Sequence, residues 1–160
     1  MHTTKNDLAE GTRAKIAELC NARLADAIDL QTQCKQAHWN VKGPSFIALH
    51  ELFDKINEDV EEYVDTIAER IVQLGGTAEG TARSVAKRST LAEYVPKGIG
   101  GRDHVDALST ALATFGKGVR QAIDHAAKLE DADTADLFTE VSRGVDKWLW
   151  FVEAHLQAER

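Results

Sequence analysis

Apolar residues recur every three or four positions along four long stretches of the chain, which is the spacing of the buried face of a helix. The predicted helices cover residues 12–40, 45–74, 103–129 and 133–157. Pro44 suits the first turn of the second helix, and Gly75 with Gly76 ends it. Each apolar stripe is narrow, so we expect the four helices to bury their stripes against one another in a bundle.

Composition agrees with an all-α chain and narrows its organisation. With 160 residues, 43% of them hydrophobic and only 2 prolines, the chain suits a single helical domain. We expect residues 12–160 to form that domain and residues 1–11 to be a short N-terminal tail. Cys20 and Cys34 lie too far apart on one predicted helix to bridge each other, so we expect buried thiols in a reducing cytosol.

The lengths of the connections predict how the helices are joined. The turns near Gly43 and Asp131 are short and make antiparallel neighbours, whereas residues 75–102 are long enough to run the length of a helix. A four-helix bundle with one long crossover between its second and third helices is the ferritin-like arrangement. A disordered insertion of this length is the alternative. Within the crossover we expect a helical turn at residues 91–95.

The second predicted helix carries more acid than a solvated surface needs. Between residues 51 and 70 only Lys55 and Arg70 oppose a long series of Asp and Glu. Like charges four positions apart destabilise a helix, and a bound cation would relieve them. At about 100° per residue, one outward sector, well away from the apolar stripe, holds a histidine and three acids. These candidate metal ligands are His50, Asp54, Asp65 and Glu69.

The separation of these ligands along the helix predicts a site shared between two chains. His50 and Asp54 lie 11 to 19 positions from Asp65 and Glu69, which is roughly 16 to 28 Å at the rise of an α-helix. One chain cannot bring both pairs to one ion. A second copy, packed antiparallel about a two-fold axis near Asp59, would place the two pairs opposite each other. We therefore expect a homo-oligomer with two-fold shared metal sites.

The mixture of imidazole and carboxylate ligands suits ferrous iron, and zinc, manganese or cobalt are expected to compete for the same site. Ferritin-like di-iron sites inside a bundle use Glu-x-x-His on two helices. None of the six histidines here has a glutamate three positions before it. This favours a site between chains over a site inside the bundle. The ordinary alternative for His50 and Asp54 is a surface pair one helical turn apart.

Six segments carry a distinctive combination of residues. They are residues 36–43 (QAHWNVKG), 46–54 (FIALHELFD), 65–70 (DTIAER), 73–76 (QLGG), 133–136 (DTAD) and 146–151 (DKWLWF). In sequence and spacing these segments resemble the Dps family, the DNA-binding proteins from starved cells. The resemblance covers nearly all of the chain beyond residue 12.

The resemblance implies a hollow dodecamer whose ferroxidase centres hold iron with five side chains. One subunit supplies His38, His50 and Asp54, and its two-fold mate supplies Asp65 and Glu69. It also implies that the protein oxidises ferrous iron, preferably with hydrogen peroxide, and stores the ferric product as a mineral. Such an enzyme protects DNA and the cell from oxidative damage. Without the resemblance, His38 would be interpreted as a core histidine.

Further roles follow from position in the family or on the second helix. Trp39 resembles the family's tryptophan near the metal centre. Acids at the start of the fourth helix line pores for iron at the three-fold axes of the family, which suggests Asp131, Asp133 and Asp136. Acids that share the outward sector of the second helix are suggested as mineral-nucleation sites, namely Glu58, Glu61 and Glu62. The ordinary alternatives are that Trp39 packs, Asp133 caps its helix and the other acids are solvated.

The main alternative function is a structural protein that condenses nucleoid DNA and binds metal incidentally; a metal-stabilised oligomer without turnover is a third. The net charge of -7, and an N-terminal tail in which acids offset Lys5, argue against tight DNA binding. Basic residues of the crossover, repeated over a shell, would add weak contacts to DNA phosphates. They are Arg83, Lys87, Arg88, Lys97 and Arg102. No apolar run is long enough for a membrane span and no leader pattern is present, so we expect a cytoplasmic protein, nucleoid-associated if DNA is bound.

Overall fold

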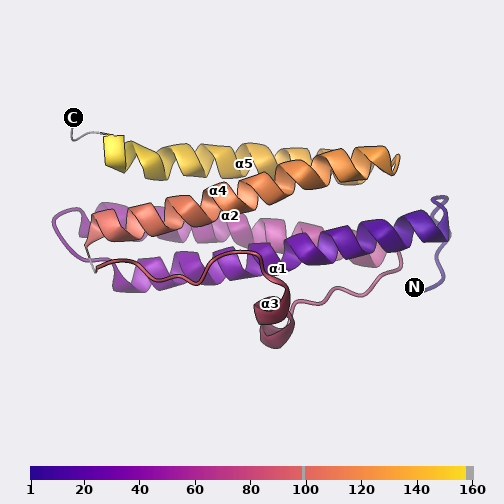
Figure 1. Ribbon diagram of the computed structural model, residues 1–160, viewed down its shortest axis with the longest axis horizontal. Helices are drawn as coiled ribbons and strands as arrows, with labels where there is room; N and C mark the ends of the chain where they lie inside the picture. The colour runs from indigo at the N-terminus through magenta and orange to yellow at the C-terminus, as the bar shows by residue number, and fades with distance from the viewer. Residues whose placement is uncertain (99, 158–160) are drawn as a thin grey trace.

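The computed structural model describes residues 1–98 and 100–157 (Figure 1). The helices of these residues are α1 (Glu10–Asn40), α2 (Phe46–Gln73), α3 (Ala82–Arg88), α4 (Gly101–Lys128) and α5 (Ala132–Gln157). The predicted all-α class is confirmed. The four long helices agree with the predicted ones, and their ends differ by no more than a turn, as helix ends commonly do.

The long helices pair into two hairpins. α1 packs against α2, and α4 packs against α5, with a short turn joining each pair (Figure 1). The crossover returns the chain to the end of the bundle where α2 begins, so α4 runs in the same direction as α2. The result is the predicted four-helix bundle with one long crossover.

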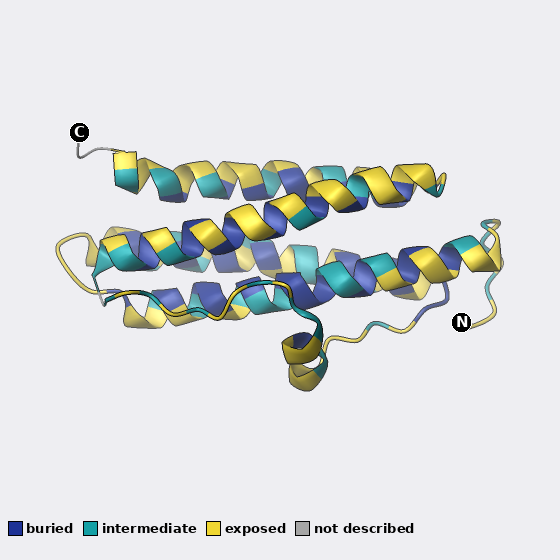
Figure 2. Cartoon of the chain, viewed as in Figure 1, coloured by how far each residue is buried: buried dark blue, intermediate teal, exposed yellow. Residues whose placement is uncertain are grey.

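The sides of the helices that face one another make a single core. Phe53 of α2, Phe115 of α4 and Phe138 of α5 are fully buried, and Leu24 and Leu30 of α1 join them. Burial of each such side chain contributes about 1.5–3 kcal/mol. Figure 2 shows the buried faces turned inward along all four helices. Among the described residues, no helix combines the length and the apolar character that a membrane span requires.

Both cysteines lie in this core as free thiols, as predicted. Cys20 and Cys34 have no accessible surface. Burial raises the pKa of each thiol to about 12, so neither is a thiolate at neutral pH. They contribute packing and are not poised for metal binding or redox chemistry.

Polar side chains of α1 hold the crossover against the bundle. Asn21 donates a hydrogen bond to the backbone at the start of the crossover. Asp26, itself buried, accepts one from the Thr90 N–H at 2.7 Å, and Gln33 donates one to the Ala92 carbonyl at 3.1 Å. These bonds run along α1 and hold the described part of the crossover in place, so the alternative of a disordered insertion is wrong for it.

The short helix of the crossover lies earlier than the apolar spacing predicts. Residues 82–88 form α3, whereas residues 91–95 contain no helical turn, so that prediction is wrong. Pro96 disfavours the helical conformation in the residue before it. The sequence of α3 is instead rich in Ala, Arg and Lys, which favour helix, and Val85 buries its side chain where α3 packs against α1.

Candidate metal centre

The turn between α1 and α2 brings two histidines into contact. α1 ends at Asn40, and Gly43 reverses the chain with a φ of 116°, which side chains other than glycine rarely adopt. His38 near the end of α1 then stacks on His50 near the start of α2. Their ring centroids lie 3.7 Å apart and their ring planes differ by 22°.

The backbone of this turn selects the protonation pattern of both rings. His38 Nδ1 lies 2.9 Å from the carbonyl oxygen of His50, and His50 Nδ1 lies 2.8 Å from the carbonyl oxygen of His38. A carbonyl oxygen only accepts hydrogen bonds, so each Nδ1 carries the proton. In a neutral imidazole this leaves the lone pair on Nε2, the form that binds a metal ion. Each histidine therefore keeps on Nε2 the lone pair that a metal ligand needs.

Asp54 lies one helical turn after His50 and beside the same pair of rings. Its Oδ1 is 3.9 Å from His38 Nδ1 and 2.6 Å from Lys35 Nζ. The hydrogen bond from Lys35 holds the pKa of Asp54 below its usual range, so this carboxylate is charged at neutral pH. Imidazole nitrogen and charged carboxylate oxygen are donor types that suit a ferrous ion. We call His38, His50 and Asp54 the histidine half-site.

Asp65 and Glu69 lie on the other half of α2, away from the histidine half-site. Both are exposed, whereas Ile67 and Ile71 of the same helix are fully buried, as the helical spacing predicts. No group of three or more His, Cys, Asp or Glu side chains in residues 1–98 and 100–157 is arranged to hold a metal ion. The described part of one chain therefore carries two separated parts of the predicted site and does not complete it.

Trp39 does not pack into the core of its own chain. Its side chain is 67% exposed and lines a groove of about 1350 Å³ between α1, α2 and the crossover. Lys35 and Glu61 line the same groove. Glu58 and Glu62, the other two predicted nucleation acids, are exposed on α2. The groove runs beside the histidine half-site, which leaves Trp39 available to a neighbouring molecule.

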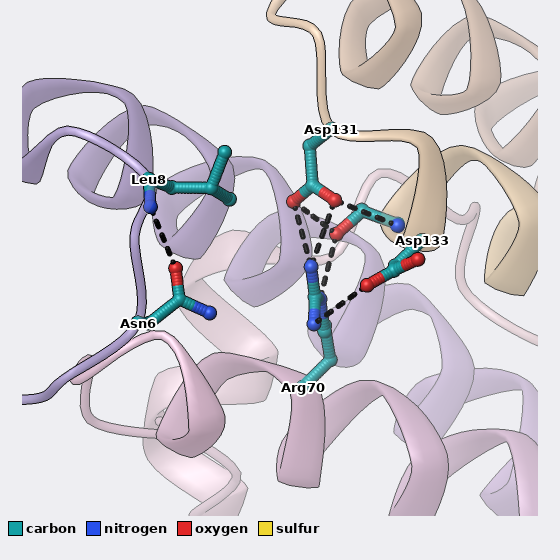
Figure 3. Close-up of polar contacts among 6 residues, drawn as sticks. Asn6, Leu8, Arg70, Asp131 and Asp133 are labelled. Atoms are coloured by element: carbon teal, nitrogen blue, oxygen red, sulfur yellow. Dashed lines mark hydrogen bonds and ion pairs between the residues drawn. The ribbon is translucent and has the colours of Figure 1, made fainter.

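Asp131 does not fit the predicted pore, because it belongs to a buried network at the turn between α4 and α5 (Figure 3). Arg70 Nη2 lies 2.7 and 3.0 Å from the two carboxylate oxygens, and the side chain of Asp131 is 2% exposed. The backbone N–H of Thr134 donates to the same carboxylate at 3.0 Å, so Asp131 caps α5. The ordinary alternative, in which Asp133 caps this helix, is therefore wrong. Asp133 and Asp136 are exposed, and the pore prediction stays with them.

The sequence interpretation gave no structural role to two basic residues that lie next to predicted ligands. Lys35 precedes His38 by three positions, and that helical spacing could have placed both on one face. Arg70 follows Glu69 directly, but its partner Asp131 is 61 positions away. No local pattern links residues so far apart, so only the packed structure identifies that pair.

A four-helix bundle with a single long crossover between its second and third long helices has the architecture of the ferritin-like class. A family model described as a ferritin-like domain matches residues 17–160. The chain is 46% identical to the DNA protection during starvation protein of Agrobacterium fabrum, over 98% of this chain and 96% of that protein.

Solved structures agree with this class. The structure of Dps from Mycobacterium smegmatis matches with a TM-score of 0.93 and 31% identity, over 99% of this chain and 96% of that one. A Dps protein from Vibrio cholerae O1, described as a member of a broad superfamily of ferritin-like diiron-carboxylate proteins, matches with a TM-score of 0.90 and 25% identity. That match covers 98% of both chains. The chain belongs to the Dps family, which confirms the resemblance found in the sequence.

Proposed function

We propose that this protein is a ferroxidase and an iron store. It oxidises ferrous iron, preferably with hydrogen peroxide, at centres shared between two subunits, and keeps the ferric mineral inside a hollow dodecamer. The observation that supports this most strongly is the pair of backbone-locked histidines beside Asp54, together with the absence of a complete site in the described part of one chain. The mate's Asp65 and Glu69, brought opposite by a two-fold axis, would complete the centre.

Each group has a chemical role in this proposal. His38 and His50 bind ferrous iron through Nε2, and the carboxylates balance its charge as it becomes ferric. One peroxide accepts two electrons, one from each of two ferrous ions, and two hydroxide ions form. Because both electrons are delivered to one peroxide, no hydroxyl radical is released. Trp39 lies beside the centre, at the groove.

Further assignments belong to the same proposal. Iron enters through three-fold pores lined by Asp133 and Asp136, and Glu58, Glu61 and Glu62 nucleate the mineral on the inner surface. Zinc, manganese or cobalt compete with iron for the centre. The protein works in the cytoplasm, and it is associated with the nucleoid where DNA is bound.

DNA protection follows in this proposal mainly from the removal of iron and peroxide. The curated relative from Agrobacterium fabrum is named for DNA protection during starvation. Among the basic residues of the crossover, Arg88 is paired with Glu18 and Glu79, whereas Arg83 and Lys87 are exposed. A few exposed basic side chains, repeated over a shell, support weak binding to DNA. A tight gel shift at physiological salt that is lost on removal of residues 1–11 would favour the alternative of a DNA-condensing structural protein.

Turnover by the wild type and by single variants tests the ferroxidase. Anaerobic loading with ferrous iron followed by peroxide is expected to give rapid ferric absorbance at about two irons per peroxide. His50→Ala and Asp65→Ala are each expected to lose this phase. Glu51→Ala, an exposed acid next to His50, is the matched control and is expected to keep it. Iron oxidation by the wild type no faster than in buffer would refute the proposal.

Hybrid shells test whether two chains share each centre. When the His50→Ala and Asp65→Ala chains are co-assembled, a mixed dimer combines one doubly damaged centre with one intact centre. Random mixing then restores about a quarter of the wild-type centres. If one chain supplied every ligand, the hybrid would be as inactive as its parents, and the shared site would be excluded.

A further inference from the structure

The histidine half-site already contains a cation that belongs to the protein. Lys35 Nζ lies 2.6 Å from Asp54 Oδ1, which is the length of a strong charge-assisted hydrogen bond. The two side chains are 30% and 40% exposed, so the pair is half-open to solvent. Lys35 comes from α1, one turn before His38, and reaches across to α2. It therefore bonds to a carboxylate that the proposed function assigns to iron.

If a metal ion and this ammonium group both bound the Asp54 carboxylate, their positive charges would repel each other. The same Oδ1 lies 3.9 Å from His38 Nδ1, so the ammonium, the carboxylate and the imidazole are crowded together. A divalent ion bound by Asp54 and the imidazoles would lie close to the positive charge of Lys35. Two positive charges at such a distance repel each other even at a hydrated surface.

The structure also provides a place for the displaced lysine. Lys35 lines the groove of about 1350 Å³ that runs beside the half-site, and Glu61 lines the same groove. The lysine side chain is long and flexible, and a carboxylate in the groove offers a second acceptor. The side chain of Lys35 is 30% exposed, so it can turn away from Asp54 toward solvent or the groove.

We propose that Lys35 is a placeholder cation that orients Asp54 in the empty centre and must be displaced when a divalent metal binds, so that it sets the metal affinity of the site. This inference rests on the proposed function, because it assumes that Asp54 is a ligand. Lys35 lowers the affinity for every divalent ion that uses Asp54.

Anaerobic titration of the assembled apoprotein with cobalt(II), followed by visible absorbance and calorimetry, tests the proposal without turnover. Lys35→Met removes the charge and keeps the length of the side chain, and it is expected to tighten cobalt binding about tenfold. Lys35→Arg keeps the charge and is expected to stay within about threefold of the wild type. Lys55→Met removes an exposed charge next to Asp54 on the same helix and is expected to change the affinity less than about twofold.

The outcomes separate this inference from the proposed function. Cobalt binding that His50→Ala does not weaken would refute the metal centre itself. Binding that depends on His50 but is equal or weaker in Lys35→Met refutes only the role of Lys35. Lys35→Gln carries the same expectation and replaces Lys35→Met if that variant does not assemble.

Discussion

The buried pair of Arg70 and Asp131 is expected to be a main support of the end of α2 that carries Asp65 and Glu69. Arg70 Nη2 bonds to both oxygens of Asp131, and Arg70 Nε lies 2.8 Å from the Thr134 hydroxyl oxygen. The pair joins α2 to the turn between α4 and α5 (Figure 3). Its loss would loosen the helix at Glu69, directly before Arg70.

Asp131→Ala is expected to cost about 3–5 kcal/mol, because it leaves the guanidinium of Arg70 buried without its carboxylate and removes the α5 cap. Asp131→Asn keeps the shape and part of the hydrogen bonding, so about 1–3 kcal/mol is expected. The matched control is Asp133→Ala. Its carboxylate lies 4.0 Å from Arg70 Nη1 but is 87% exposed, and such a pair contributes little.

The pH dependence of the pair has a definite sign. Burial raises the pKa of Asp131, but the hydrogen bonds from Thr134 and Arg70 outweigh it and hold the pKa below its usual range. A carboxyl group with a lowered pKa in the folded state stabilises the fold above its unfolded pKa of about 3.9. That stability disappears as the pH falls through the lower pKa of the folded state. The advantage of the wild type over Asp131→Asn should therefore shrink in acid.

Urea unfolding followed by tryptophan fluorescence measures these differences. Protein concentration must be held constant, because assembly adds to the apparent stability. A loss below about 1 kcal/mol in Asp131→Ala, or a loss in Asp133→Ala of equal size, would refute the reasoning. The unfolding free energy of the double variant Arg70→Met with Asp131→Ala should exceed the value expected from adding the single losses.

Three other changes test separate parts of the fold. Burial lowers the pKa of His104 below its ordinary value, so the stability of the fold should fall as the pH drops below about 6.5. His104→Gln should remove this fall from a plot of melting temperature against pH, and an unchanged plot would contradict the role of His104. A Cβ at Gly144 would overlap the Tyr63 hydroxyl, so Gly144→Ala should lose about 1–3 kcal/mol in urea unfolding, largely restored by Tyr63→Leu. Glu130 has a φ of 60°, so Glu130→Val should lower the free energy of unfolding in urea by about 1–2 kcal/mol, whereas Glu130→Asn should not lower it; equal values for the two variants would exclude backbone strain as the cause.

The positions of the long helices and the outward sector of α2 could be predicted from the sequence. Helical periodicity records which side of each helix is buried, and that information is local. It separates Ile67 and Ile71, which are buried, from Asp65 and Glu69, which are exposed. The length of the connection after Gly75 favoured one long crossover but also permitted a disordered insertion, and the hydrogen bonds from α1 to the crossover decided between them.

Only the tertiary structure decided which partner each polar group meets. The lock between His38 and His50 depends on two backbone carbonyls in a turn, and the pair of Lys35 and Asp54 depends on the register of α1 against α2. Asp131 looked like a surface acid until Arg70, from a distant helix, was packed against it. Periodicity specifies a face and not a neighbour, so contacts between helices become visible only when packing sets their relative register.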